Sequence, residues 1–454
     1  IRDAQESRGL GDVYKRQDID DAITNAKYAF DQCWSTTPAA ERGRILSNLG
    51  RLILKNIDLL STLEALDVGK PFTQAQADVR ALARYMEFYG GAADKVHGET
   101  IPYLEGYTVY TLREPHGVTG HIVPWNYPMQ IIGRSVGAAL AMGNSCVLKP
   151  AEEACLTALT FANLALEAGL PAGVLNVVTG LGASAGAALC ANKGINHISF
   201  TGSVATGRLV QAAAAYNIVP VTLELGGKSP QLFFEDANLE NALPFLVNAG
   251  IQNGGQTCSA SSRILVHRSR YEEVVDRMAK KYKELIVRPA IDDGALGPLI
   301  SERQKSIVED FISKGQNLNL VAQGEIDGKA PEKGHYVAPH LFAGVSDDHI
   351  LAKDEIFGPV QVIMPFDTEE EAIKIANHKI DKMILFQRPG HEVRLNAPNE
   401  VSWEEVVSNA KNTDCVEMNS NEFAYILYTS GTTGTPKGIV RDTGGHIVAL
   451  KWTM

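Results

Sequence analysis

The chain has 454 residues, of which 45% are hydrophobic and 21% are charged. This length provides for two or three domains with a sizeable core, and the composition is typical of a globular protein rather than a disordered one. No apolar run reaches the ~20 residues that a membrane-spanning helix needs, so we expect no membrane partner. The formal net charge of −11 argues against a nucleic-acid partner, because nucleic-acid-binding surfaces are usually basic.

The cysteines indicate a reducing compartment. They form neither a CxxC pair nor a dense disulfide framework, so we predict a cytoplasmic location, no metal site, and a reactive thiol as the role of any functional cysteine. The six are Cys33, Cys146, Cys155, Cys190, Cys258 and Cys415.

Residues 1–17 are polar and aperiodic, with neither the apolar centre of a signal peptide nor the composition of a transit peptide. The first methionine is Met86, and residues 1–17 resemble translated sequencing adapter. We therefore expect this segment to be non-native and to form no part of the fold.

Apolar residues recur every three or four positions from residue 18 to residue 30, and the segments 39–66 and 75–93 continue in the same style. This spacing predicts amphipathic helices. Residues 102–115 contain alternating apolar positions that predict a hairpin arm.

From residue 117 short apolar runs alternate with helical segments, which predicts βαβ units in a doubly wound parallel sheet. A second α/β segment follows from 229 to about 377, and the composition becomes charged and irregular near 380. The first set of expected strands is 117–123, 145–149, 173–179, 198–201 and 219–225.

Cys258 follows a glycine-rich stretch, Asn-Gly-Gly-Gln-Thr-Cys. A thiolate is a nucleophile, and a glycine-rich turn lets the backbone approach a substrate and offer amide donors. The alternative for any one cysteine is a small buried apolar residue.

Two other residues are candidates for chemistry. Glu224 ends an apolar strand before two glycines, at the sheet edge where α/β enzymes place their sites, and can act as a general base. Asn126, between two prolines after another strand, can donate to an oxyanion. The alternatives are a solvated strand-end glutamate and an asparagine that bonds only its local turn.

Three features suit a dinucleotide. Lys149 and Glu152 flank a proline just after a strand, where a cation and an acid can bind ribose hydroxyls. Residues 202–207 follow a strand and open a helix, and their glycines let a pyrophosphate approach the helix N-terminus, although a lone GxxxxG is more often packing. Glu355 and Phe357 precede a tight turn.

Taken together, in this order and spacing, these motifs resemble the NAD(P)-dependent aldehyde dehydrogenases over residues 18–380. The interval from Glu224 to Cys258 matches the active-site pair of that family. The motifs are Pro124-Trp125-Asn126, Lys149-x-x-Glu152, Phe200-Thr201-Gly202-Ser203, Glu224-Leu225-Gly226-Gly227-Lys228, Gly255-Gln256-x-Cys258 and Glu355-x-Phe357-Gly358-Pro359.

The resemblance implies that Cys258 attacks an aldehyde, that Asn126 holds the oxyanion, and that Glu224 activates water to hydrolyse a thioester. It implies NAD as the cofactor, with NADP less favoured because Glu152 repels a 2′-phosphate. A homodimer or homotetramer is usual in the family. The cofactor-binding residues that it implies are Trp125, Lys149, Glu152, Gly202, Ser203, Gly207, Leu225, Glu355 and Phe357.

The fold that follows is α/β and aldehyde dehydrogenase-like. It has N-terminal helices and a doubly wound NAD-binding domain over 18–225, then a second α/β catalytic domain over 226–380 that is incomplete at its C-terminal end. Residues 381–454 resemble a fragment of an acetyl- or propionyl-CoA synthetase, carried by the glycine- and threonine-rich motif at 425–438. We therefore expect a chimeric sequence, with a non-catalytic nucleotide-binding product or an acyl-CoA ligase as alternatives.

Overall fold

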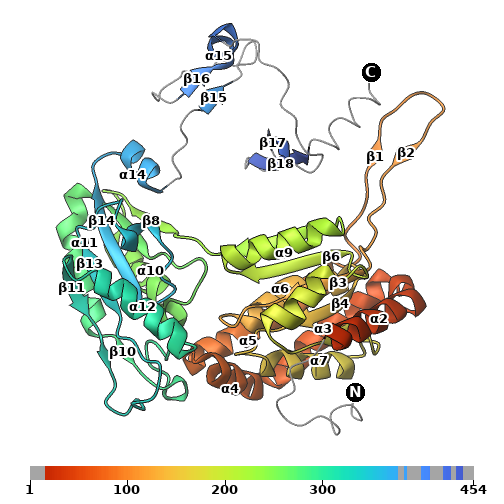
Figure 1. Ribbon diagram of the computed structural model, residues 1–454, viewed down its shortest axis with the longest axis horizontal. Coiled ribbons are helices and arrows are strands. Elements are labelled where there is room, and N and C mark those ends of the chain that lie inside the picture. The colour runs from red at the N-terminus through yellow and green to blue at the C-terminus, as the bar shows by residue number, and fades with distance from the viewer. Residues whose placement is uncertain (1–15, 377–382, 386–399, 410–422, 431–435, 443–454) are drawn as a thin grey trace. The chain divides into compact units, whose positions relative to one another are not determined.

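The computed structural model describes residues 16–376 as a continuous stretch, and then 383–385, 400–409, 423–430 and 436–442 (Figure 1). The chain divides into two compact units, Ile1–Asn377 and His378–Met454. The residues that position the candidate site lie in the first unit. The segment interpreted as adapter falls almost entirely outside the described residues.

Four helices open the first unit. The expected helix over 39–66 is instead two helices, because the chain breaks at Asn56, whose side-chain amide donates to the Leu52 carbonyl at 2.8 Å. An asparagine side chain that bonds a nearby backbone carbonyl competes with helix continuation. The helices are α2 (Arg16–Gln32), α3 (Ala39–Lys55), α4 (Ile57–Val68) and α5 (Phe72–Ala92).

A short antiparallel hairpin follows these helices. Strand β1 (Thr100–Ile101) pairs with β2 (Val109–Tyr110), and three of these four residues are exposed. The hairpin extends away from the first sheet (Figure 1).

The first sheet has five strands in the order β5-β4-β3-β6-β7, and all the pairings are parallel. This confirms the doubly wound parallel sheet that the sequence predicts. The strands are β3 (Val118–Ile122), β4 (Ser145–Lys149), β5 (Leu175–Val177), β6 (His197–Gly202) and β7 (Val221–Leu225). The helices between them are α6 (Pro128–Ala141), α7 (Leu156–Glu167), α8 (Ala187–Ala191) and α9 (Val204–Tyr216).

Alternate residues of β4 face opposite sides of this sheet, as the two-residue period of a strand requires. Cys146 and Leu148 belong to a buried cluster with residues of α3, α5, α6 and α7. Val147 packs in a separate cluster with residues of α2, α8 and α9. Helices therefore cover both faces, which explains why β4 is apolar along most of its length.

The second sheet has the order β11-β13-β14-β9-β8, in which β11 is antiparallel to β13 and the other pairs are parallel. Its strands are β8 (Pro230–Phe233), β9 (Arg263–His267), β11 (Asn319–Gln323), β13 (His340–Ala343) and β14 (Val360–Phe366). In β14, Ile363 packs with α10 (Leu239–Ile251) and α11 (Tyr271–Lys283), and Val362 packs with α12 (Glu302–Lys314).

Smaller elements complete the first unit and make up the described part of the second. In the first unit they are β10 (Ile286–Val287), β12 (Glu325–Ile326), α13 (Ile350–Lys353) and α14 (Glu369–Ala376). In the second they are β15 (Met383–Leu385), β16 (Glu400–Ser402), α15 (Trp403–Asn409), β17 (Phe423–Ser430) and β18 (Pro436–Asp442). Strands β17 and β18 pair antiparallel, and residues 431–435 of the expected phosphate-loop motif lie outside the described residues.

Within the parts of the chain that the structure describes, no helix combines the length and apolar character needed to span a membrane.

Helices α3 and α5 cross with their backbones in contact at Gly43 and Gly90. A Cβ atom added at Gly90 would lie 2.8 Å from the Gly43 carbonyl oxygen and 2.9 Å from the Ser47 hydroxyl. Any side chain at either glycine would push the two helices apart, and α5 carries residues that reach the candidate site.

We expect Gly90→Ala to lower the free energy of unfolding by about 1–3 kcal/mol, because the added methyl group overpacks the crossing. The neighbouring Gly91 has no atom within 4 Å of an added Cβ. Gly91→Ala is therefore the matched control, and we expect it to be neutral or to stabilise the helix by up to about 1 kcal/mol. Urea unfolding of both variants measures the difference, and equal effects would contradict the proposed helix contact.

Candidate active site

The candidate site residues of the first sheet lie where its strands end. The chain runs from β3 to β4 and β5, then returns to the other side of β3 with β6 and β7. In such sheets ligands bind outside the carboxyl ends of the strands, at the point where the order reverses. Asn126 follows β3, Lys149 ends β4, and Gly202 ends β6, so three separate motifs meet at this edge.

The turn that leads to Cys258 has an unusual backbone. Asn253, Gly254 and Gly255 all have left-handed φ values, of 52°, 64° and 74°. A Cβ atom at Gly255 would lie 2.1 Å from the Gly358 carbonyl oxygen, so no side chain fits there. The turn presents Cys258 as a free, partly exposed thiol.

Asn126 is buried and holds this turn through its side chain and its backbone. Its Nδ2 donates to the Gln256 carbonyl at 2.9 Å, and its own carbonyl accepts from Asn253 Nδ2 at 2.9 Å. An amide nitrogen carries two hydrogens, so one remains for a ligand. The structure thus brings Asn126 to the backbone turn that carries Cys258.

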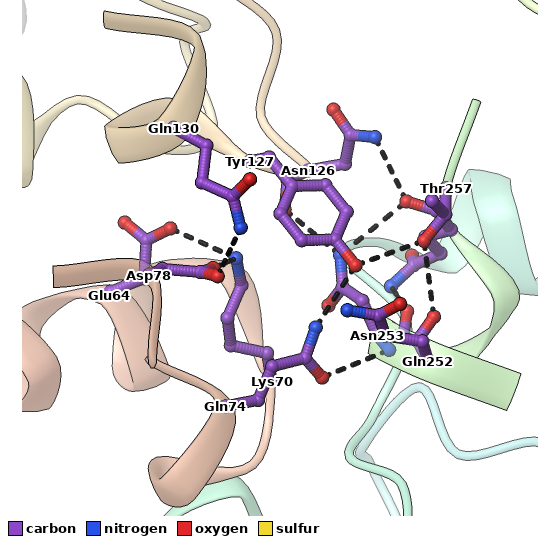
Figure 2. A network of polar contacts seen from close by, with 11 residues as sticks. Glu64, Lys70, Gln74, Asp78, Asn126, Tyr127, Gln130, Gln252, Asn253 and Thr257 are labelled. Carbon is purple, nitrogen blue, oxygen red and sulfur yellow. Dashed lines mark hydrogen bonds and ion pairs between the residues drawn. The ribbon is translucent and has the colours of Figure 1, made fainter. Parts of the chain in front are cut away.

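A wider network surrounds this contact (Figure 2). Tyr127 bonds Thr257 and Gln74, each at 3.0 Å, and Gln74 Oε1 accepts from the Asn253 backbone at 3.1 Å. Three segments far apart in sequence, 70–78, 126–130 and 252–257, are joined in this way. None of Tyr127, Thr257 and Gln74 was singled out by sequence, although Tyr127 and Thr257 adjoin Asn126 and Cys258.

Glu224 lies on β7 with its side chain about half exposed (52%), and its carboxylate is 3.9 Å from the Arg134 guanidinium of α6. Both side chains line an open cavity of about 730 Å³ that also includes His121 and His197. The loop after β7 approaches the backbone of Cys258, since a Cβ at Gly227 would lie 3.8 Å from the Cys258 carbonyl oxygen.

Lys149 and Glu152 form an ion pair at the end of β4, with a 3.0 Å separation. The Lys149 side chain is almost fully buried, whereas that of Glu152 is 41% exposed. Burial alone would raise the pKa of Glu152, but the hydrogen bonds and the charge of Lys149, with backbone amides, outweigh it and lower the pKa. Glu152 therefore presents an ionised carboxylate to solvent.

The N-terminus of α9 is exposed. Ser203 caps it by accepting from the Thr206 amide at 3.2 Å, which leaves the other first-turn amides to solvent or a ligand. A Cβ at Gly207 would lie 2.7 Å from Leu225, so Gly207 lets α9 close against β7. A Cβ at Gly202 would meet the Phe200 ring at 2.6 Å.

Trp125 and Phe357 meet edge to face, with ring centroids 5.4 Å apart. Phe357 has a left-handed φ of 55°, and the turn around it is held in part by Gln304, whose side chain donates to the Phe357 carbonyl at 3.0 Å. Nearby, Glu355 accepts from the Gly227 amide at 3.3 Å, and a Cβ at Gly226 would lie 2.0 Å from the Glu355 carboxylate. The Glu355 turn and the loop after β7 therefore touch.

These surfaces fit a dinucleotide. An ionised carboxylate beside a buried lysine suits ribose hydroxyls, and an exposed helix N-terminus backed by glycines suits a pyrophosphate. The described residues contain no cluster of three or more His, Cys, Asp or Glu side chains arranged to hold a metal ion.

Comparison with known proteins agrees with this geometry. The aldehyde dehydrogenase family model matches residues 8–380, and the AMP-binding enzyme model matches residues 358–454. Rat cytosolic aldehyde dehydrogenase 1 is 42% identical over 370 residues, which cover 80% of this chain and 73% of the rat protein. Aldehyde dehydrogenase family 2 member C4 of Arabidopsis thaliana is also 42% identical, with the same coverage of both chains.

Solved structures agree as well. A Burkholderia cenocepacia protein assigned to the aldehyde dehydrogenases is 56% identical with a TM-score of 0.80, covering 83% of this chain and 80% of its own. An NAD+ complex of a Bacillus cereus aldehyde dehydrogenase is 40% identical with a TM-score of 0.78, covering 82% and 77%. The fold and the site therefore define an α/β protein with a dinucleotide-binding surface at the edge of its first sheet and a partly exposed cysteine in a glycine-rich turn. The chain belongs to the aldehyde dehydrogenase family.

Lys228 is the last residue of the motif that begins at Glu224, and the sequence assigns it no role of its own. Its side-chain nitrogen is buried and has no hydrogen-bond partner among the residues that the structure describes. Burial, with a smaller contribution from Arg263, lowers the pKa of Lys228 to about 7. A lysine that loses its proton near neutral pH inside a site is a group that the sequence motif alone does not identify.

A folded-state pKa below the unfolded value means that the unfolded chain binds more protons between pH 7 and 10. The free energy of unfolding of the wild type should therefore rise with pH across this window, relative to a Lys228→Met variant. Urea unfolding at several pH values measures the difference, with Lys193→Met, at an exposed position, as the control. A constant difference between wild type and Lys228→Met would show that Lys228 is not buried as described.

Proposed function

We propose that this chain oxidises an aldehyde to a carboxylic acid with NAD and that Cys258 is the nucleophile. The observation that carries the proposal is the hydrogen bond from Asn126 to the Gln256 carbonyl, because it holds an amide donor at the turn that presents a partly exposed thiol. Family membership supports the reaction, and the geometry supports the assignment of residues.

The surroundings of Cys146 argue against a role as the nucleophile. It is fully buried within β4, and burial raises the pKa of its thiol to about 12. A thiol that neither ionises near neutral pH nor contacts solvent is not a nucleophile. Cys258 is partly exposed, and the turn that carries it accepts a hydrogen bond from the Asn126 amide at Gln256.

In the first step the Cys258 thiolate forms a bond to the aldehyde carbon, the carbonyl π bond breaks, and its electron pair makes the carbonyl oxygen an oxyanion. The second hydrogen of the Asn126 amide and the Cys258 backbone N–H are the donors for it. These groups are fixed before substrate arrives, since Asn126 is buried and bonded on two sides. Preorganised donors of this kind lower the barrier because they need no rearrangement during the reaction.

NAD, when bound, supplies the hydride acceptor that converts the thiohemiacetal on Cys258 into a thioester. We assign its adenosine ribose to Lys149 and Glu152, its pyrophosphate to the exposed first turn of α9, and its nicotinamide ribose to Glu355. The ionised Glu152 disfavours the 2′-phosphate of NADP by charge repulsion, so NAD is the favoured cofactor. Trp125 and Phe357 contribute an aromatic surface beside it.

Glu224 is the proposed base for hydrolysis. Its carboxylate takes a proton from water, the hydroxide oxygen bonds to the thioester carbon, and the carbon–sulfur bond breaks to release the acid and the Cys258 thiolate. The Arg134 guanidinium lies 3.9 Å from this carboxylate. A water-activating base also argues against transfer of the acyl group to coenzyme A.

Three further proposals follow from this one. We propose a homodimer or homotetramer, as is usual in the family, and a cytoplasmic location, in keeping with the free thiols among the described residues. Light scattering after gel filtration distinguishes the oligomers. The proposed division into 18–225, 226–380 and 381–454 is tested by limited proteolysis.

A separate proposal concerns residues 381–454. Their resemblance to acyl-CoA synthetases is supported by the AMP-binding enzyme match at 358–454. We propose that this segment was joined to an aldehyde dehydrogenase sequence and contributes no ligase activity. Amplification of genomic DNA across the codons for 377–388 tests the junction, and a continuous product of the stated sequence would refute it.

Cys258→Ala should abolish NADH formation from a simple aldehyde, because no other partly exposed thiol lies in the described turn. Cys146→Ala should retain activity, since it removes only a buried sulfur. Absorbance at the NADH band measures both variants. Turnover that survives Cys258→Ala, or that is lost with Cys146→Ala alone, would overturn the assignment of the nucleophile.

Glu224→Gln should keep the first turnover and slow the steady state by about 10²–10⁴-fold, because it removes the base for hydrolysis. Rapid mixing should then show a burst of NADH followed by a slow phase, with an acyl group on Cys258 by mass spectrometry. Added hydroxylamine should restore turnover by cleaving the thioester. A variant without a burst would place Glu224 before the thioester instead.

A further inference from the structure

A buried ion cluster lies next to the candidate site and takes no part in the chemistry proposed above. Lys70, between α4 and α5, places its ammonium 3.0 Å from a carboxylate oxygen of Glu64 and also contacts the carboxylate of Asp78. None of the three residues is more than 1% exposed. Buried charges are costly and persist where they are paired, so this cluster is a fixed point in the interior.

The cluster contains two carboxylates for one ammonium. Burial, followed in size by the opposing effect of Lys70 and then by the repulsion from Asp78, raises the pKa of Glu64 to about 7. Burial alone would lower the pKa of Lys70, but the two carboxylates outweigh it and raise that pKa. The ammonium therefore stays charged throughout the neutral range.

Tyr127 packs on this cation. The Lys70 ammonium lies 4.3 Å from the centroid of the Tyr127 ring, within the range of a cation–π interaction. Gln130, one turn further along, donates to Asp78 at 2.6 Å. The start of α6 is thus held on the ion cluster at two points (Figure 2).

From Tyr127 a directed chain of hydrogen bonds reaches the nucleophile turn. Gln74 Nε2 donates to the Tyr127 hydroxyl, and Thr257 donates to the Gln252 carbonyl at 3.3 Å. The single hydroxyl hydrogen of Thr257 goes to the Gln252 carbonyl, so the Tyr127 hydroxyl is the donor in the 3.0 Å bond between Tyr127 and Thr257. Each hydroxyl in the chain therefore accepts one bond and donates one.

Gln74 also fixes the strained part of the turn. Its Oε1 accepts from the backbone of Asn253, the residue with a left-handed φ of 52°. One side chain from α5 thus contacts both Tyr127 and the first residue of the left-handed run. A non-glycine residue keeps that conformation only where its surroundings hold it.

We propose that Tyr127, Gln74 and Thr257 are positioning residues that set Cys258 relative to Asn126, anchored on the cluster of Glu64, Lys70 and Asp78. Thr257 adjoins Cys258 and Tyr127 adjoins Asn126, so one hydroxyl contact links the thiol to the oxyanion donor. The inference rests on the proposed function because it takes Cys258 as the nucleophile. Small misplacements of reacting groups cost large factors in rate.

The test compares Thr257→Val with Thr257→Ser in the full chain. Thr257→Val keeps the side-chain shape and loses the hydroxyl, and we expect kcat to fall about tenfold with KM for the aldehyde within about twofold. Amide exchange over 252–258 should rise. Thr257→Ser keeps the hydroxyl and should restore kcat and amide protection.

Tyr127→Phe should reproduce the effects of Thr257→Val. The kcat of the double variant should lie within about twofold of the kcat of either single variant, because both substitutions remove the hydrogen bond between Tyr127 and Thr257. Tyr271→Phe is the control. The Tyr271 hydroxyl accepts a hydrogen bond from the backbone amide of Gly344 at 2.6 Å, but it bonds no residue of the network that joins Lys70 to Thr257. We expect it to leave kcat and exchange over 252–258 unchanged.

Each outcome has a defined meaning. Wild type that makes no NADH would refute the proposed function, and amide exchange would still report on the turn. Active wild type with Thr257→Val or Tyr127→Phe indistinguishable from Tyr271→Phe would overturn the positioning role. Effects of the two variants that multiply in the double variant, or a failure of Thr257→Ser to restore kcat, would also overturn it.

Discussion

The hydrogen bond between the Asn126 side chain and the Gln256 carbonyl joins the two α/β layers of the first unit at the candidate site. Asn126 comes from the end of β3 in the parallel first sheet, and Gln256 from the turn after α10, which packs on the second sheet. Chemistry that needs a thiol and an amide donor side by side depends on this one contact. The bond is buried, so water does not compete for it.

The two layers contribute different things to that contact. The first sheet gathers strand ends at one edge, because its order reverses at β3. The second layer contributes a turn with three left-handed residues in succession, a conformation that glycine and asparagine adopt more readily than other residues. Neither feature alone makes a reactive cysteine. The network from Lys70 to Thr257 adds rigidity from a third direction, the N-terminal helices.

Much of this arrangement was predictable from sequence. Strands, connecting helices and the parallel sheet follow from short-range patterns, and the candidate residues stand in short motifs at strand ends and turns. Contacts between distant segments were not predictable. Nothing local shows that Lys70, in a Gly-Lys-Pro turn, is fully buried, or that it faces a tyrosine 57 positions later. The break between α3 and α4 at Asn56 was not predictable from sequence, because the hydrogen bond from its side chain to the Leu52 carbonyl leaves the spacing of apolar residues intact. Gly207, predicted to bind cofactor, also has a packing role against Leu225.

The uneven burial of the cysteines determines which thiols of this protein an oxidant would reach first. Thiol oxidation follows thiolate character and exposure. Cys146 and Cys190 are sheltered, and burial raises their pKa values to about 12 and about 11. Cys258 is partly exposed, as the proposed nucleophile must be to meet a substrate. A sulfur that a substrate can reach is also accessible to peroxide, so we expect Cys258 to be oxidised before Cys146 and Cys190.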